Sequence, residues 1–116
     1  MELRRFAFHF RHIARSMDRL LTYADAKSLS TEQIAVMKAE LEPGARQGAL
    51  FSELHAALKS AGERVRAFSI ADFELPRMIG RQQIPTTLGG ILVHVADHTQ
   101  RHVGQAITTA KIVKGR

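Results

Sequence analysis

A chain of 116 residues is long enough for one domain with a small core, so residues 1–116 are treated as a single domain. The composition, 45% hydrophobic and 24% charged, is that of a soluble globular protein and argues against disorder. No apolar run approaches the roughly 18–20 residues of a membrane span, and no signal peptide is recognisable, so we expect a cytoplasmic protein. The absence of cysteine excludes disulfides and thiolate ligands, so any metal site must use nitrogen or oxygen.

The net charge of +6 raises the question of a nucleic-acid or anionic-membrane partner. The basic residues are scattered, however, and they are not interleaved with aromatic residues. No glycine-rich phosphate loop is present either. The pattern therefore favours the solvated faces of basic helices over a nucleic-acid or membrane interface.

The N-terminal half of the chain predicts one long helix followed by a short one. Residues 6–26 carry a single apolar stripe at three-and-four spacing, formed by Phe6, Phe10, Ile13, Met17, Leu20, Leu21 and Ala24. Residues 28–30 interrupt this pattern. Ser30, with Gln33 three residues later, resembles a capping box that opens a helix ending near Leu41. Turn chemistry then predicts a loop over residues 42–44.

The C-terminal half predicts two further long helices. Residues 46–68 carry the stripe Leu50, Leu54, Ala57, Leu58, Ala61, Val65 and Phe68. Residues 69–85 show no sustained period and are predicted to be a long ordered connection. A last helix over residues 87–114, with Thr86 as its N-cap, carries the stripe Leu88, Ile91, Leu92, Val95, Ala106, Ile112 and Val113. The prediction is an all-α helical bundle.

Three of the six histidines, His94, His98 and His102, recur every four residues on the last predicted helix. At about 100° per residue, and with Ile91 at zero, His98 falls near −20° and His102 near +20°, in the middle of the apolar stripe. His94 falls near −60°, on its shoulder. Two imidazoles on adjacent turns can reach one ion, and imidazole suits zinc, nickel, iron or copper rather than magnesium or calcium.

The spacing alone leaves two interpretations open, since a core histidine satisfied by a hydrogen bond is also common. Gln105, near −40° on the same line, and Gly104, which allows close backbone approach, favour a polar site. The H-E-x-x-H pattern of zinc proteases is absent, because Asp97 precedes His98 and no glutamate lies between the pair. His12 on the first helix could supply a third ligand, but periodicity places His9 nearer the apolar stripe of that helix and so does not choose His12.

Two stretches of the chain resemble a known family. Residues 80–113, with His98, His102, Gly104 and Gln105, are similar to the C-terminal helix of DinB-like proteins (the DinB/YfiT superfamily). Residues 8–23 resemble the family's second helix, whose histidine in an H-[IL]-A context corresponds to His12. Where many members have arginine after the second histidine of the pair, this chain has Val103.

The resemblance implies an up-and-down four-helix bundle with a three-histidine divalent metal site at His12, His98 and His102, often filled by nickel or zinc. It also implies kinship with proteins assigned as metal-dependent hydrolases and thiol S-transferases, hence a small-molecule or thiol substrate, and it does not imply DNA binding. Family members usually carry another helix before the one that matches here. We therefore expect a truncated member, or a bundle completed by dimerisation.

Two functional hypotheses follow from the resemblance. In the first, the chain is a metal-dependent enzyme in which Gln105, His94 and Asp97 surround the ligands, with Asp97 as a weak candidate for a proton acceptor. No catalytic residue is assigned, because no carboxylate lies convincingly on the metal-facing line. In the second, the chain is a metal-binding or structural bundle, such as a stress-related protein, without catalysis.

Overall fold

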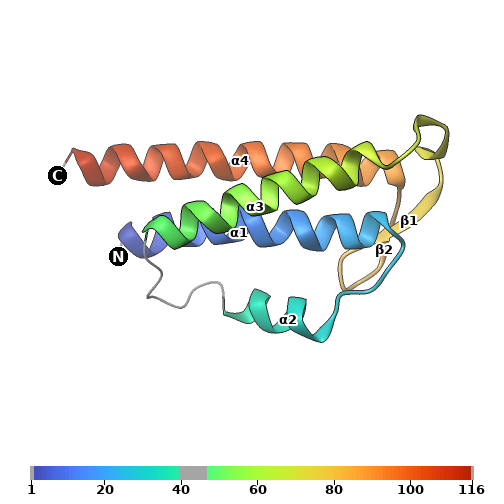
Figure 1. Cartoon of the computed structure of the whole chain (residues 1–116), viewed down its shortest axis with the longest axis horizontal. Coiled ribbons are helices and arrows are strands. Elements are labelled where there is room, and N and C mark those ends of the chain that lie inside the picture. Colours follow the sequence, from blue (N-terminus) through green and yellow to red (C-terminus); the bar gives the residue numbers. More distant parts are fainter. Residues whose placement is uncertain (1, 40–46, 116) are drawn as a thin grey trace.

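Three long helices lie side by side in the computed structural model, which describes residues 2–39 and 47–115 and the side chains of residues 8–39 and 48–115 (Figure 1). They are α1 (Glu2–Ala24), α3 (Gln47–Arg66) and α4 (Leu88–Lys114). α1 is the central helix, packing on both α3 and α4. The directions of travel along α1, the short α2 (Thr31–Lys38), α3 and α4 alternate (Figure 1). The predicted all-α, up-and-down arrangement is confirmed, with α2 only eight residues long.

The core forms where the predicted stripes meet. Its fully or nearly buried members come from α1, α3 and α4: Ile13, Met17, Leu21, Ala24, Ala61, Leu88, Ile91 and Val95. Apolar side chains three and four apart share one face of a helix, so each helix contributes a continuous ridge. Ile112, which we placed on the α4 stripe, is instead 49% exposed.

The helix boundaries agree with the prediction to within a few residues. The capping box at the start of α2 is present: the Gln33 backbone N–H donates to the Ser30 Oγ, and the Ser30 backbone N–H donates to the Gln33 Oε1. The predicted end near Leu41, the loop over residues 42–44 and the predicted start of the next helix at residue 46 lie outside the described residues. The N-cap of α4 is Thr87, one residue later than predicted, because its Oγ1 accepts a hydrogen bond from the Gly90 N–H.

The segment expected to be an irregular connection contains a short 3₁₀ turn (Ile70–Asp72) and a β-hairpin, β1 (Pro76–Ile79) and β2 (Ile84–Thr87). The strands pair antiparallel from Pro76↔Thr87 to Ile79↔Ile84. Each strand has four residues and buries neither face, so no alternating apolar pattern marked it in the sequence. A two-stranded ribbon leaves each strand with a free edge, which tolerates its prolines.

The hairpin is held against the helices by tertiary contacts rather than by its own length, since an isolated two-stranded ribbon is at best marginally stable. The Arg77 Nε donates to the Ala24 carbonyl at the C-terminus of α1, at 2.7 Å. The Gly89 N–H donates to the Phe73 carbonyl at 2.8 Å. A Cβ at position 89 would lie 3.1 Å from that carbonyl oxygen, so the close approach favours glycine there.

Within the described residues, no helix combines the length and the hydropathy needed to cross a membrane.

Candidate metal centre

The α4 stripe changes chemistry midway along the helix. Ile91, Val95 and Ala106 are buried against the other helices, and between them the same stripe carries His98 and His102, both partly buried. The two rings lie one turn apart, with centroids 4.6 Å from each other. The predicted placement of both histidines on the core-facing line of α4 is what the structure shows.

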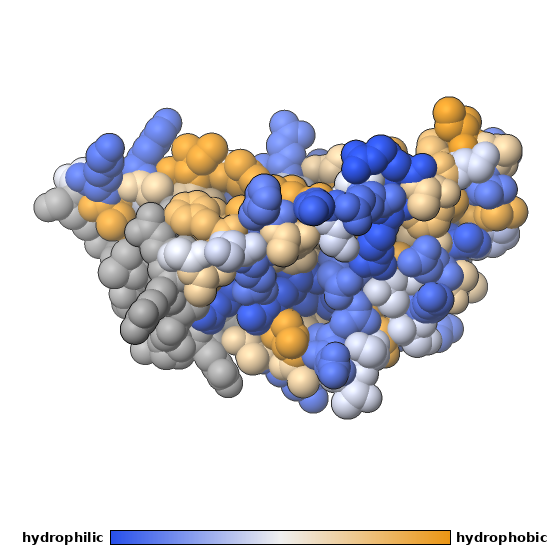
Figure 2. Space-filling view, in the orientation of Figure 1, coloured by the Kyte–Doolittle hydropathy of each residue, from blue (hydrophilic) through white to orange (hydrophobic). Residues whose placement is uncertain are grey.

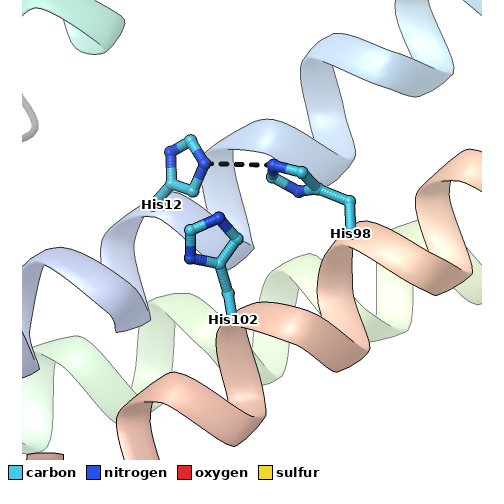
Figure 3. A group of neighbouring side chains, drawn as sticks. All are labelled: His12, His98 and His102. Atoms are coloured by element: carbon cyan, nitrogen blue, oxygen red, sulfur yellow. Dashed lines mark hydrogen bonds between the residues drawn. The ribbon is translucent and has the colours of Figure 1, made fainter.

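His12 of α1 completes a cluster with them. Its Nε2 lies 3.3 Å from the Nε2 of His98, and its ring centroid lies 4.3 Å from that of His102. One ligand nitrogen from each of the three residues falls within 4.8 Å of the others. Figure 3 shows the three rings, one from α1 and two from α4, turned toward a common point. Histidines 86 and 90 residues apart in the sequence are thus brought together by helix packing.

The separation of two of these nitrogens fits a shared ion. Two nitrogens at about 2.0–2.1 Å from a tetrahedral zinc ion lie about 3.3–3.4 Å apart. The Nε2 atoms of His12 and His98 meet this spacing at 3.3 Å. All three donors are imidazole nitrogens of borderline softness, which suits zinc, nickel or copper, so the residues present fit the divalent metal that the sequence predicts.

The electrostatics of the cluster disfavour a positive charge on two of its rings, His102 and His98. Burial, followed by the positive charges of His12, His98, His9 and Arg101, lowers the pKa of His102 to about 4. Burial also lowers the pKa of His98, with smaller effects from His12 and other nearby cations. Because a metal binds the lone pair of a neutral imidazole, a lowered pKa reduces competition from protons.

His9, the alternative that periodicity left open, lies beside the cluster. Its Nδ1 is 3.2 Å from the Nδ1 of His102, and burial lowers its pKa. The sequence could not separate His9 from His12 because both lie on the face of α1 that meets α4. The ring of Phe8 stacks on His12, with centroids 5.1 Å apart and an interplanar angle of 21°.

Ser16 is a neighbour of the cluster that sequence reasoning missed. Its side chain is buried, its Oγ lies 3.4 Å from the Nδ1 of His98, and the same Oγ donates to the Ile13 carbonyl at 3.3 Å. The available signal was spacing: positions 9, 12 and 16 are three and four residues apart and so share one face of the helix.

Of the three residues predicted to surround the ligands, Gln105 and Asp97 lie away from the cluster, and only His94 contacts a ligand. Gln105 is exposed, and Asp97 is exposed and pairs with Arg101 at 2.8 Å. His94 is exposed too, although its ring stacks on His98 at 5.7 Å. On the ideal helical wheel the buried residues of α4 centre near +40° rather than at Ile91. Gln105, near −40°, therefore falls at the edge of the interface.

The described pockets do not include the three histidines. One, of about 470 Å³, lies at the hairpin end and is lined by residues that include Tyr23, Lys27 and Arg81. Another, of about 500 Å³, lies between α1, α2 and α3. The imidazole cluster, whose three residues are partly buried between α1 and α4, is therefore separate from both pockets.

The sequence profile of the DinB superfamily matches residues 4–106 of the chain, which includes all three clustered histidines. The chain belongs to the DinB superfamily. This membership agrees with the helical architecture and is compatible with metal binding at His12, His98 and His102. Val103, a departure from the DinB pattern, is 41% exposed and is not part of the cluster. Searches of curated proteins and of solved structures found no match to the chain.

Proposed function

We propose that this protein binds one divalent transition-metal ion, nickel or zinc, through His12, His98 and His102. The convergence of three imidazole donors within 4.8 Å carries the proposal. Imidazole binds these metals well, whereas magnesium and calcium select oxygen ligands. Three protein ligands leave at least one coordination position for water or a substrate, which is typical of catalytic rather than structural sites.

The activity we propose is that of a metal-dependent hydrolase or thiol S-transferase acting on a small molecule. His12, His98 and His102 would hold the ion, which when bound would lower the pKa of a coordinated water or thiol and so supply a nucleophile near neutral pH. The chain's own contribution is to hold three imidazole donors in position and to shield one side of the site. The aromatic ring of Phe8 does the latter by covering His12.

A specific observation favours the second candidate, a metal-binding bundle without catalysis. A general base must lie within hydrogen-bond reach of the proton it removes. Among the described side chains, no carboxylate belongs to the imidazole cluster, and the nearby Asp97 is exposed and paired with Arg101. The described pockets are also not lined by the histidines.

Metal content tests the shared part of both candidates. The purified protein should hold about one nickel or zinc ion per chain after equilibration and desalting, and His98→Ala and His102→Ala should lose it. His55→Ala is the matched control, because His55 is an exposed histidine on α3. Metal-free wild type under these conditions would refute the proposal.

An activity assay then separates an enzyme from a non-catalytic metal-binding protein. Metal-loaded wild type is tested against a panel of thiols and electrophiles, and an enzyme should show turnover that is lost in His102→Ala.

We also propose that the protein is a homodimer. α3 exposes Phe51, Leu58 and Val65 at seven-residue spacing, and α4 exposes Val103 and Ile107. Figure 2 shows hydrophobic surface along the C-terminal half of α4. Contiguous exposed apolar surface commonly marks an association site. Light scattering should give twice the chain mass for wild type and a single chain mass for Leu58→Glu; a monomeric wild type at micromolar concentration would refute the dimer.

A further inference from the structure

Each α4 histidine of the cluster has its second ring nitrogen in contact with a side chain of α1. The Nδ1 of His98 lies 3.4 Å from the Ser16 Oγ, and the Nδ1 of His102 lies 3.2 Å from the Nδ1 of His9. These contacts occupy Nδ1 in both rings, while the Nε2 of His98 faces the Nε2 of His12 at 3.3 Å, the spacing at which two nitrogens share an ion. On α1, His9 and Ser16 flank the ligand His12 along the same helix face.

The Ser16 contact has a definite direction. A hydroxyl has a single proton, and that of Ser16 is donated to the Ile13 carbonyl at 3.3 Å. The Ser16 oxygen is then available as an acceptor toward His98. Because Ser16 is only 4% exposed, water is poorly placed to substitute for it. The arrangement therefore selects the neutral His98 ring that has its proton on Nδ1 and a lone pair on Nε2.

The His9 contact is also directional. Two imidazole nitrogens at 3.2 Å form a hydrogen bond only if one donates and the other accepts. When His102 offers the lone pair of Nε2 to an ion, its proton is on Nδ1 and must be donated. The Nδ1 of His9 is then the acceptor, and the proton of the neutral His9 ring is on Nε2.

We propose that Ser16 and His9 are positioning residues that hold His98 and His102 as Nδ1–H tautomers with Nε2 facing the ion. This inference rests on the proposed metal binding and extends it to two residues outside the ligand set. A neutral imidazole without such partners exchanges its proton between two nitrogens and rotates about its side-chain bonds, so it must be ordered when the ion binds. Removing such outer partners typically weakens metal affinity by about 10–100-fold.

The affinity test compares variants that differ in one acceptor. Zn²⁺ and Ni²⁺ affinities are measured by competition with a chromophoric chelator for wild type, Ser16→Ala, His9→Leu and His9→Asn. Ser16→Ala and His9→Leu should each bind about 10–100-fold more weakly. His9→Asn should bind nearly as wild type, because its amide oxygen occupies the δ position of the side chain and accepts the same bond. Ser52→Ala and His55→Leu, both at exposed positions of α3, are the matched controls.

A second readout separates positioning from a merely structural role. Nitrogen-15 NMR of the imidazoles in metal-free protein at pH 8 should report Nδ1–H for His98 and His102 in wild type. Ser16→Ala should give a mixture of tautomers at His98 alone, and His9→Leu at His102 alone. Helical content by circular dichroism should be unchanged in both.

The outcomes distinguish a failure of metal binding from a failure of the two positioning roles. A wild type that binds neither metal overturns the proposed function, while the tautomers still test the two contacts. A wild type that binds, with Ser16→Ala and His9→Leu binding equally well, overturns only the positioning roles. Protonated Nε2 in wild-type His98 and His102 overturns them as well, whatever the variants do.

Discussion

The two halves of the α1–α4 interface lie on the facing sides of the same two helices and differ in the chemistry of their side chains. Toward the hairpin, Met17 and Leu21 of α1 pack with Leu88 and Ile91 of α4, and all four are at most 3% exposed. Further along the same pair of helices, the stripe continues as His12, His98 and His102, which are only partly buried. A core-facing position therefore identifies where a side chain points, and the residue type determines whether that position stabilises the fold or forms a site.

The difference has an energetic basis. Removing apolar area from water stabilises the folded state by about 25 cal/mol per Å². A ring nitrogen at the same position needs a hydrogen-bond partner, because an unsatisfied buried polar group costs about 1–3 kcal/mol. The contacts with Ser16 and His9 supply such partners to His98 and His102. We therefore expect stability to depend on the hairpin half and metal affinity on the imidazole half.

The largest effect should come from the apolar half. Ile91→Ala removes a side chain that is 0% exposed, and truncating a buried isoleucine typically costs about 2–5 kcal/mol. Urea unfolding of the metal-free protein measures the loss. Val93→Ala, at a position 71% exposed on the same helix, should change stability by no more than about 0.5 kcal/mol. Equal losses in the two variants would contradict the described burial.

The imidazole half should show the reverse behaviour. His102→Ala should leave the metal-free protein at pH 8 close to wild-type stability but remove its stabilisation by metal. For wild type, free metal at 100 times the dissociation constant adds about 2.7 kcal/mol by mass action. Unfolding midpoints with and without Zn²⁺ measure this difference. Metal-induced stabilisation of His102→Ala equal to that of wild type would exclude His102 as a ligand.

Acid should lower the free energy of unfolding partly through the imidazole half of the interface. The folded pKa of His102 is lowered to about 4 from an ordinary value of 6.5, so the unfolded chain binds more protons between these values. This contribution to stability is fully present above pH 6.5, falls as the pH drops toward 4, and changes no further below it. Unfolding free energies across this range should therefore fall more steeply for wild type than for His102→Ala. Parallel pH profiles would argue against a lowered pKa.

The smallest effects should come from the residues outside the interface. Asp97→Asn breaks an exposed i,i+4 ion pair with Arg101, which is worth about 0.3–0.5 kcal/mol. Gln105→Ala changes an exposed side chain. Neither should alter Zn²⁺ affinity by more than about twofold, as measured against the same chelator. A tenfold loss in either variant would restore the roles that the sequence suggested for them.

Local patterns predicted much of the fold because they reflect short-range physics. The capping box at Ser30 and Gln33 and the α4 stripe were readable since both depend on neighbours within one or two turns. The hairpin could not be predicted in this way, because its strands are short and exposed on both faces. It is held in place by the hydrogen bond from Arg77 to the Ala24 carbonyl, 53 residues earlier in the chain. A contact at that separation leaves no local signature.

Four-residue spacing along the chain is enough to place two imidazoles on the core-facing side of α4, whichever helix packs against them. Helix packing determines their neighbours: His12 in the cluster, His9 and Ser16 on the outer nitrogens, and Gln105 and Asp97 toward solvent. The reason is that these assignments depend on how far α1 and α4 are rotated about their own axes. That rotation is set by the packing of side chains from all the helices and has no counterpart in the spacing of residues along one.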